Sequence, residues 1–376
     1  MSWYHLIATF LNHSLPQLRA TRRTNLALLT AAVLERRTLA LSILTRAWFC
    51  QLPYSHHQRK KRLFRFLSND RFDPMAVQTA LLEPICQAAG LRGLTPIMID
   101  WSDLGRGRNG LFAAVCFRRR GLPLLSWVAQ PEELNPSQNR LEESFLIRLL
   151  RHLPDSIQPL LLCDRGFGRA SLLRFLQQMP RYTGYPAPYV IRLKGNAIIQ
   201  TEGFRGRLGN YPLPKGRIQF LPRVHYRSDG AVVTNLVLYW GRKHQEPWYL
   251  ATSLNDPHRA VGLYRRRMQP EQYFRDGKQR FGLDSSTVTT TSRLQRLLVA
   301  ALLACCLLII AGTRAPADFR RQVCSWGKLG ILHLGWEYYL ANPHPPPRIF
   351  IPSSPQTGYA WAPLRSLLGD SAFAIS

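Results

Sequence analysis

Four residues in the C-terminal third of the chain place a phenol, a guanidinium, a carboxylate and an ammonium at helical spacing. They are Tyr264, Arg267, Glu271 and Lys278, in the segment YRRRMQPEQYFRDGKQRFGLD. An α-helix advances about 100° per residue, so these positions would fall within an arc of roughly 60° on one face. A face that only gripped phosphates would not include a carboxylate. The spacing therefore indicates a metal-binding acid framed by side chains that hold phosphates.

Pro270 directly precedes Glu271 and complicates a single straight helix. Proline is accepted in the first helical turn, but it costs about 3 kcal/mol in a helix interior. Two geometries stay open: the helix begins near Pro270, with Tyr264 and Arg267 on a preceding turn, or the helix kinks there.

Two aspartates stand where apolar strands are predicted to end: Asp100 closes TPIMID and Asp164 closes PLLLCD. Side chains at the carboxyl ends of strands in mixed α/β sheets leave the core and face a crevice. Either aspartate alone would more often be a cap or turn residue. Together with Glu271 they supply three carboxylates, which can hold two Mg²⁺ ions. Two such ions activate the attacking oxygen and stabilise the leaving oxygen in displacement at phosphorus.

The elements that must position these carboxylates follow the order β-β-β-α-β-α-β. Strands are predicted at 96–100, 111–117, 122–129, 158–164 and 188–195, and helices at 139–153 and 170–179. This order describes a mixed sheet with flanking helices, which is the α/β arrangement of the RNase H-like fold. Fold order alone is weak support for a function.

Composition shifts predict five regions along the chain. They are a helical DNA-binding region at 1–90, the first part of the RNase H-like catalytic core at 91–199, a β-rich insertion at 200–255, a second part of the core with the Glu-bearing helix at 256–340, and a Pro-rich tail at 341–376.

The chain is strongly basic, with 50 Lys and Arg against 22 Asp and Glu and a formal net charge of +28. Basic residues recur throughout, whereas a membrane-surface protein more often uses one local patch. Nucleic acid is therefore the expected partner, with no membrane. The segment HHQRKKRLFRFLSND is predicted to be a helix and turn that contact DNA, and a solvated basic helix is the alternative. Its candidate contacts are Arg62, Arg65 and Asn69.

Two patterns are similar to motifs of other protein classes, but each is predicted to be an ordinary structural element. The apolar stretch 297–312 is shorter than the roughly 20 residues that a bilayer requires, which favours a buried core helix. The glycine pattern of residues 105–110 precedes a strand rather than a helix, so it is predicted to be a basic hairpin turn. Seven cysteines without zinc spacing are predicted to be reduced core residues, and together with the lack of a signal peptide they suggest a cytoplasmic protein.

Residues 60–285 resemble the DDE transposases of insertion sequence family four. The resemblance rests on the two aspartates, on the Y-x2-R-x3-E-x6-K spacing around Glu271 and on the segments RFLSN, DRGFG, VIRLKGN, PWYLATSL and FRDGKQRFGL. It implies that Asp100, Asp164 and Glu271 bind two Mg²⁺ ions, for which Mn²⁺ can substitute. The phosphates near the DNA end would be held by Tyr264, Arg267 and Lys278, with further DNA contacts from Arg192 and Lys194.

The resemblance also implies cut-and-paste chemistry on double-stranded DNA. Water cleaves at the terminal inverted repeat of the element, and the freed 3′-OH attacks the opposite strand to form a hairpin. A second water opens the hairpin, and the 3′-OH then joins target DNA, within a homodimer assembled on two ends. Trp248 is a candidate for stacking on a flipped base, and a place in the strand core is the alternative.

Two other functions stay open at the level of sequence. One is a transposase-derived DNA-binding protein without activity, against which the presence of all three carboxylates argues. The other is a two-metal nuclease without strand transfer, which has less need for Tyr264, Arg267 and Lys278 to hold a 3′ end through several steps.

Overall fold

The computed structural model describes residues 2–47, 55–118, 120–130, 132, 138–227, 231–267, 288–324 and 330–346. These residues form two compact units. The first unit contains the described parts of Met1–Leu91, Trp101–Pro136 and Pro270–Gln356. The second contains the described parts of Arg92–Asp100 and Ser137–Gln269. Each unit is described by itself below.

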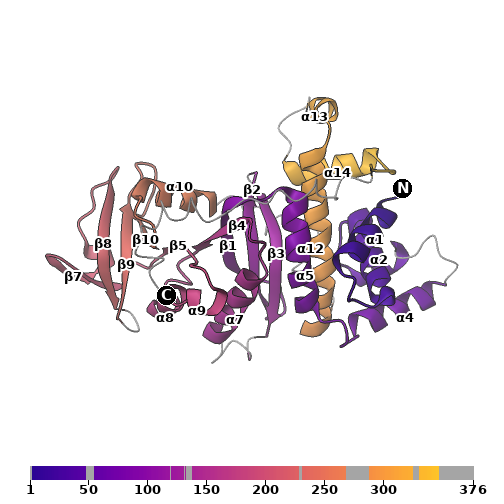
Figure 1. The fold of residues 1–376 in the computed structure, drawn as a ribbon, viewed down its shortest axis with the longest axis horizontal. Helices are drawn as coiled ribbons and strands as arrows, with labels where there is room; N and C mark the ends of the chain where they lie inside the picture. Colours follow the sequence, from indigo (N-terminus) through magenta and orange to yellow (C-terminus); the bar gives the residue numbers. More distant parts are fainter. Residues whose placement is uncertain are drawn as a thin grey trace. The chain divides into compact units, whose positions relative to one another are not determined.

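Helices dominate the first unit, together with one antiparallel hairpin (Figure 1). The hairpin joins β2 (Asn109–Phe117) to β3 (Arg120–Ala129). The helices are α1 (Trp3–Ser14), α2 (Ala20–Arg36), α3 (Leu41–Ala47), α4 (His56–Leu67), α5 (Pro74–Ala89), α12 (Thr291–Arg314), α13 (Ala317–Val323) and α14 (Ile331–Ala341). Local sequence sets their ends: Ser55 and Gln58 form a capping box that begins α4. Gly90, in the left-handed region at φ 67°, ends α5.

The core helix of this unit is α12, which contacts α2, α5, α14 and β3. It is 24 residues long, and the most apolar part of it is entirely buried. In the described residues it is the one helix long and apolar enough to cross a membrane by length and composition. Its burial agrees with the predicted core helix, which extends beyond the apolar stretch 297–312 at both ends. Polar residues also pack inside: Gln295 Nε2 donates to the Ser126 carbonyl at 2.8 Å.

Helix α14 crosses α12 at a point where only glycine fits. A Cβ on Gly335 would lie 1.8 Å from the carbonyl oxygen of Leu308, and one on Gly312 would lie 2.3 Å from that of Ile331. Both obstacles are backbone atoms, which cannot rotate away. The two backbones therefore touch, and the crossing depends on the missing side chains.

We expect Gly335→Ala to lower the free energy of unfolding by about 3 kcal/mol or more, at the upper end of the range for overpacked cores. The measurement is urea denaturation followed by circular dichroism. Gly262→Ala is the matched control, because nothing lies within 4 Å of its Cβ position and helical Gly→Ala gains about 0.5 to 1 kcal/mol. Equal stability of the two variants would contradict close backbone contact between α12 and α14 as the cause.

The second unit is built on a mixed sheet in the order β1-β4-β5-β10-β9-β8-β6-β7. The β1–β4 and β4–β5 pairs are parallel, and the pairs from β5 onward are antiparallel. The strands are β1 (Gly93–Asp103), β4 (Ile157–Cys163), β5 (Tyr189–Arg192), β6 (Ile198–Thr201), β7 (Phe204–Arg207), β8 (Ile218–Arg227), β9 (Ala231–Tyr239) and β10 (Trp248–Thr252). Its helices are α7 (Gln138–Arg151), α8 (Ala170–Gln177), α9 (Pro180–Thr183) and α10 (Pro257–Arg267).

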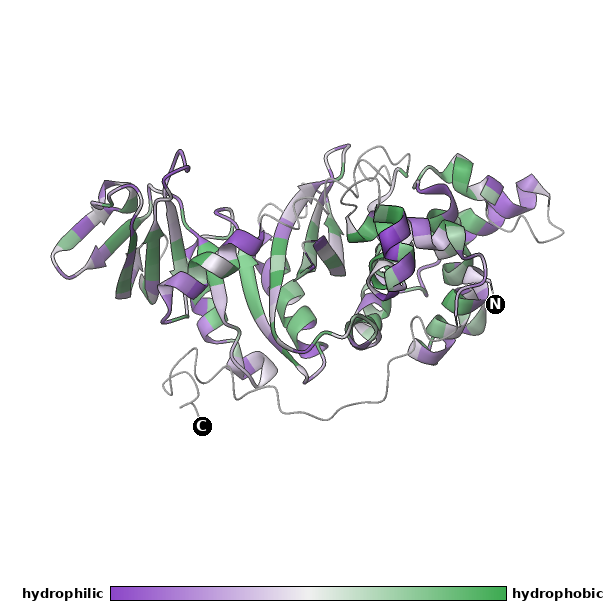
Figure 2. Cartoon of the chain, turned by 90° about the horizontal axis from the view of Figure 1, so that it is seen from above, coloured by the Kyte–Doolittle hydropathy of each residue, from purple (hydrophilic) through white to green (hydrophobic). Residues whose placement is uncertain are grey.

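Burial distinguishes the two halves of this sheet. Every residue of β4 is buried, as expected where both faces of a parallel strand are covered. Buried and more exposed positions alternate over residues 232–235 of β9, which is typical of an antiparallel strand with one covered face. Both hydrophobic and hydrophilic positions run along the strands in Figure 2. Because β10 pairs with β5, the predicted β-rich region continues the same sheet.

All seven elements predicted in the order β-β-β-α-β-α-β are present. Strand β1 is longer than predicted and runs three residues past Asp100. It then enters a tight turn in which the Leu104 amide donates to the Arg108 carbonyl at 2.9 Å. Gly105, Arg106 and Gly107 all have positive φ there, which confirms the predicted turn for residues 105–108, whereas residues 109 and 110 already belong to β2.

The cysteines of the described residues are either buried or half-buried. The buried ones are Cys86, Cys163, Cys305 and Cys306, and Cys116 and Cys324 are half-buried. They form no disulfide, which agrees with the prediction of reduced core residues.

Candidate active site

Parallel pairing brings the two predicted aspartates side by side. Ile99 of β1 is paired in register with Cys163 of β4. Asp100 directly follows Ile99, and Asp164 directly follows Cys163, the last residue of β4. The two aspartates therefore lie at the same edge of the sheet. The prediction that Asp100 ends its strand was wrong, because β1 continues to Asp103. The parallel pairing of β1 with β4, in contrast, ends at Ile99, directly before Asp100.

The loop after β4, with the sequence DRGFG, holds Asp164 by a local hydrogen bond. Its Oδ1 accepts from the Gly166 amide at 2.8 Å. Gly168 passes so close to β5 that a Cβ there would lie 2.7 Å from the Arg192 carbonyl oxygen. The Tyr226 hydroxyl of β8 donates to the Gly168 carbonyl at 2.6 Å. The glycines of this loop therefore permit contacts that place Asp164.

Helix α10 carries Tyr264 and Arg267 to the two carboxylates. Arg267 Nη2 lies 3.4 Å from Asp100 Oδ1 and 3.8 Å from Asp164 Oδ2. The Arg267 side chain is 8% exposed, and those of Asp100 and Asp164 are 18% and 35% exposed. A placement of Tyr264 and Arg267 on a turn, one of the two geometries considered, was wrong: both lie within the helix. Their spacing of three residues directs both to its buried face.

Tyr264 lies in a group of packed aromatic rings. Its ring centroid is 5.2 Å from that of Trp248, edge to face, and His244 packs on Trp248 at 4.6 Å. Burial raises the pKa of the Tyr264 phenol to about 12, and the Arg267 guanidinium opposes that rise. The phenol therefore keeps its proton at neutral pH and can donate a hydrogen bond. Trp248 begins β10 and is half-buried.

The end of β5 adds further cations at this edge of the sheet. Arg192 Nη2 lies 3.2 Å from Glu246 Oε2, and Arg165 Nη1 lies 3.9 Å from the same atom. Lys194 is exposed just beyond the strand. Arg165 belongs to the DRGFG segment, yet sequence reasoning did not select it. Its position directly after Asp164 was the signal that could have done so.

A buried ion pair behind the DRGFG loop was also missed. Arg169 Nη2 lies 2.6 Å from Glu142 Oε2, and the Glu142 side chain is only 1% exposed. Gln138 Nε2 donates to Glu142 Oε1 at 3.0 Å. Glu142 lies on α7 and Arg169 directly precedes α8, so the pair ties the loop to a flanking helix. A glutamate on the apolar face of a predicted helix was the available signal.

Glu271 and Lys278 lie outside the described residues. Within the described ranges no group of three His, Cys, Asp or Glu side chains is arranged to hold a metal ion. Asp100 and Asp164 thus supply two carboxylates, with Arg267 as their cationic neighbour.

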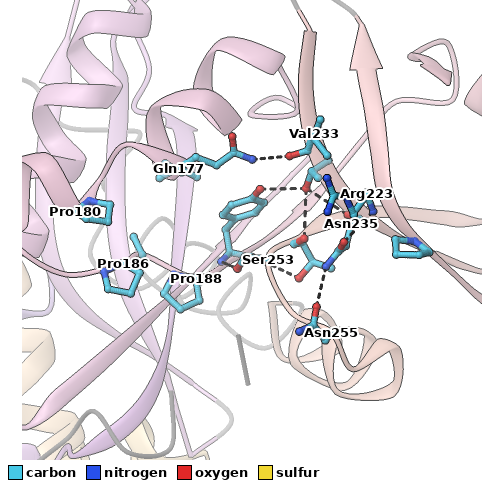
Figure 3. Close-up of a pocket in the computed structure, with 15 residues that line it drawn as sticks. Gln177, Pro180, Pro186, Pro188, Arg223, Val233, Asn235, Ser253 and Asn255 are labelled. Carbon is cyan, nitrogen blue, oxygen red and sulfur yellow. Dashed lines mark hydrogen bonds between the residues drawn. The ribbon is translucent and has the colours of Figure 1, made fainter. Parts of the chain in front are cut away.

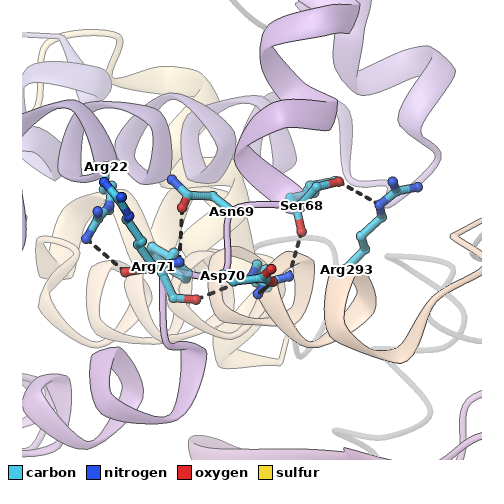
Figure 4. A network of polar contacts seen from close by, with 9 residues as sticks. Arg22, Ser68, Asn69, Asp70, Arg71 and Arg293 are labelled. Atoms are coloured by element: carbon cyan, nitrogen blue, oxygen red, sulfur yellow. Dashed lines mark hydrogen bonds and ion pairs between the residues drawn. The ribbon is translucent and has the colours of Figure 1, made fainter.

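The DNA-contact candidates from the RFLSN region lie in the first unit. Arg62 Nε donates to Asn25 Oδ1 at 3.0 Å, and Arg65 is exposed on α4. Asn69 Oδ1 accepts from the Arg71 amide at 3.1 Å, within the polar network of Figure 4. Asn69 therefore has a local structural role in the turn after α4.

A pocket of about 580 Å³ lies in the second unit, away from the carboxylates (Figure 3). It is lined by Tyr189, the first residue of β5, and by neighbouring parts of β9 and β10, whereas Asp164 follows the last residue of β4. Arg223, with φ 51° beside a bulge in β8, reaches this pocket. No Asp or Glu side chain lines it among the described residues. The candidate site is therefore identified by its carboxylates rather than by a cavity.

Fold and site together define a mixed α/β protein that places two carboxylates beneath an arginine at one edge of its sheet. The family described as "Transposase DDE domain" matches residues 105–307, which is more than half of the chain. The chain belongs to this family. None of the curated proteins compared with it matches. The prediction that the protein is a DDE transposase is confirmed at the level of the family.

Proposed function

We propose that the chain is a transposase of insertion sequence family four that cuts the ends of its element and joins them to target DNA. The observation that carries the proposal is the register of β1 and β4, which sets Asp100 and Asp164 side by side under Arg267. Family membership and the net charge of +28 support DNA as the substrate. The RNase H-like topology and a homodimer on two DNA ends are parts of the same proposal.

The carboxylates of this site fit Mg²⁺. Asp100 and Asp164 present oxygen ligands, which this ion prefers, and both remain partly exposed. Glu271 is proposed as the third ligand for a pair of ions. Bound ions would polarise the phosphate and activate the attacking oxygen. Arg267 has five N–H donors, so it can contact these carboxylates and a phosphate oxygen at once.

The other residues of the site hold and orient DNA in this proposal. The protonated Tyr264 phenol donates to a phosphate oxygen. Lys278, Lys194 and Arg192 add cations along the backbone of the bound strand. Trp248, which is half-buried, stacks on a base that leaves the helix when the 3′-OH attacks the opposite strand and forms a hairpin.

Trp248→Ala should slow hairpin formation while first-strand cleavage continues. Loss of base stacking removes about 1 to 3 kcal/mol, which corresponds to roughly a tenfold to hundredfold change. The two products can be separated on denaturing gels with a labelled duplex. Trp248→Phe keeps an aromatic ring and should recover most of the hairpin. Equal loss of both products in Trp248→Ala would instead indicate that the ring only supports Tyr264.

A strand-transfer assay with the terminal repeats of the element separates this proposal from its two alternatives. Joined product supports a transposase. Cleavage without joining identifies a nuclease, and a gel shift without cleavage identifies an inactive DNA-binding protein. The repeats can be read from the inverted sequences that flank the gene.

A further inference from the structure

The first unit contains a second basic site, which does not involve the two aspartates. It is a pocket of about 360 Å³ between α3, α4 and the segment that leads into α12. Its polar lining includes three cationic side chains: Arg46 of α3, Lys60 of α4 and Arg293 in the first turn of α12. Thr45 and His56 also line the pocket. None of the described residues that line it is acidic.

Helical spacing makes the wall from α4 continuous. His56, Lys60 and Phe64 are four residues apart, so they lie above one another on one face. Lys60 is exposed, while Phe64 below it is half-buried and forms the apolar part of this wall. Lys61, the next residue, points to a different face of the same helix.

Contacts between the three elements fix the shape of the pocket. Thr45 Oγ1 and His56 Nε2 lie 3.4 Å apart and join α3 to α4. Arg293 of α12 donates through Nε to Ser68 Oγ at 2.8 Å (Figure 4), and its guanidinium lies 5.8 Å from the centre of the Phe64 ring. The terminal nitrogens of Arg293 donate to no atom in the described part of the chain. The guanidinium is thus held in place with donors remaining for a ligand.

We propose that this pocket binds a backbone phosphate of double-stranded DNA. Three cations from separate elements around a concave, acid-free site match a phosphate group. Arg293 presents a planar fork suited to two phosphate oxygens, and Lys60 a point charge. The proposal rests on the proposed function, since it assigns a contact to the DNA of that reaction.

Salt dependence of DNA binding tests the pocket independently of catalysis. Fluorescence anisotropy is measured in EDTA over a range of NaCl concentrations, with the full-length chain and two labelled duplexes: the terminal inverted repeat and an unrelated sequence. Each phosphate contact contributes about 0.9 to the slope of log K against log salt. Lys60→Gln should lower this slope by about that amount, and the combined Arg46, Lys60 and Arg293→Gln variant by about three times as much. The same change is expected on both duplexes, because phosphate contacts do not read sequence.

Lys61→Gln is the matched control, because it removes the same exposed charge one position away on α4. A slope that falls equally for Lys60→Gln and Lys61→Gln would overturn the proposal, because the two lysines would then attract DNA by their charge alone, without a specific phosphate contact in the pocket. An unchanged slope in the combined variant would overturn it as well. If the pocket variants keep full binding while an Asp164 variant loses cleavage, the pocket is wrong and the proposed function stands. If the unmodified chain binds neither duplex, both are wrong.

Discussion

Asp164→Asn is expected to abolish cleavage at the element's ends, with a loss of roughly a thousandfold or more. Removing a ligand charge from a metal site forfeits several kcal/mol of transition-state stabilisation, and each 1.36 kcal/mol is tenfold in rate. The asparagine keeps the side-chain oxygen that accepts from the Gly166 amide at 2.8 Å, so the DRGFG loop should retain its conformation. The loss would therefore report the charge at the carboxylate rather than a misplaced loop.

Cleavage of a labelled terminal-repeat duplex in Mg²⁺ gives the rate, and anisotropy in EDTA gives the binding. DNA binding should stay close to that of the unmodified chain. Asp103→Asn is a matched control, because this exposed residue of β1 also accepts a backbone amide, that of Gly105 at 2.8 Å. It should cleave normally. Full activity of Asp164→Asn would refute the metal-ligand assignment of Asp164.

The sequence could predict the strands of this site because each has a local signal. Buried runs such as TPIMID and PLLLCD need no partner to be recognised, and each aspartate directly follows such a run. What the sequence could not provide was the register of β1 on β4, which sets the aspartates side by side. Register depends on contacts between residues more than sixty positions apart, and a local pattern carries no information on them.

Features that depend on a partner from another element were not predicted for the same reason. Nothing local shows that Arg267 lies within α10 with its guanidinium beside two carboxylates, because Pro270 left open whether Arg267 belongs to a helix or to a turn. The glycines at the α12–α14 crossing occur in ordinary helical sequence. Only the close contact of Gly335 with the Leu308 backbone shows that a glycine is required there. The β-rich region was predicted correctly as strands, but its attachment to β5 through β10 required tertiary contacts.

The buried pair of Glu142 and Arg169 leads to the second large expected effect. Glu142→Ala should lower the free energy of unfolding of the second unit by about 3 to 5 kcal/mol, because it leaves a desolvated guanidinium without its carboxylate. The lower end is expected, since the Arg169 side chain is 17% exposed and can recruit water. Glu142→Gln should cost less, because its carbonyl can still accept from Gln138, as Glu142 Oε1 does at 3.0 Å.

Urea denaturation of Glu142→Ala and Glu246→Ala separates burial from charge. Both changes remove one carboxylate from an arginine in the same unit, but Glu246 is 65% exposed. An exposed pair contributes about 0 to 1 kcal/mol, so Glu246→Ala should unfold almost as the unmodified chain does. Equal losses of unfolding free energy would show that the Glu142–Arg169 pair stabilises the unit no more than an exposed ion pair does. A large loss confined to Glu142→Ala would mean that the buried ion pair between α7 and the end of the DRGFG loop stabilises the second unit.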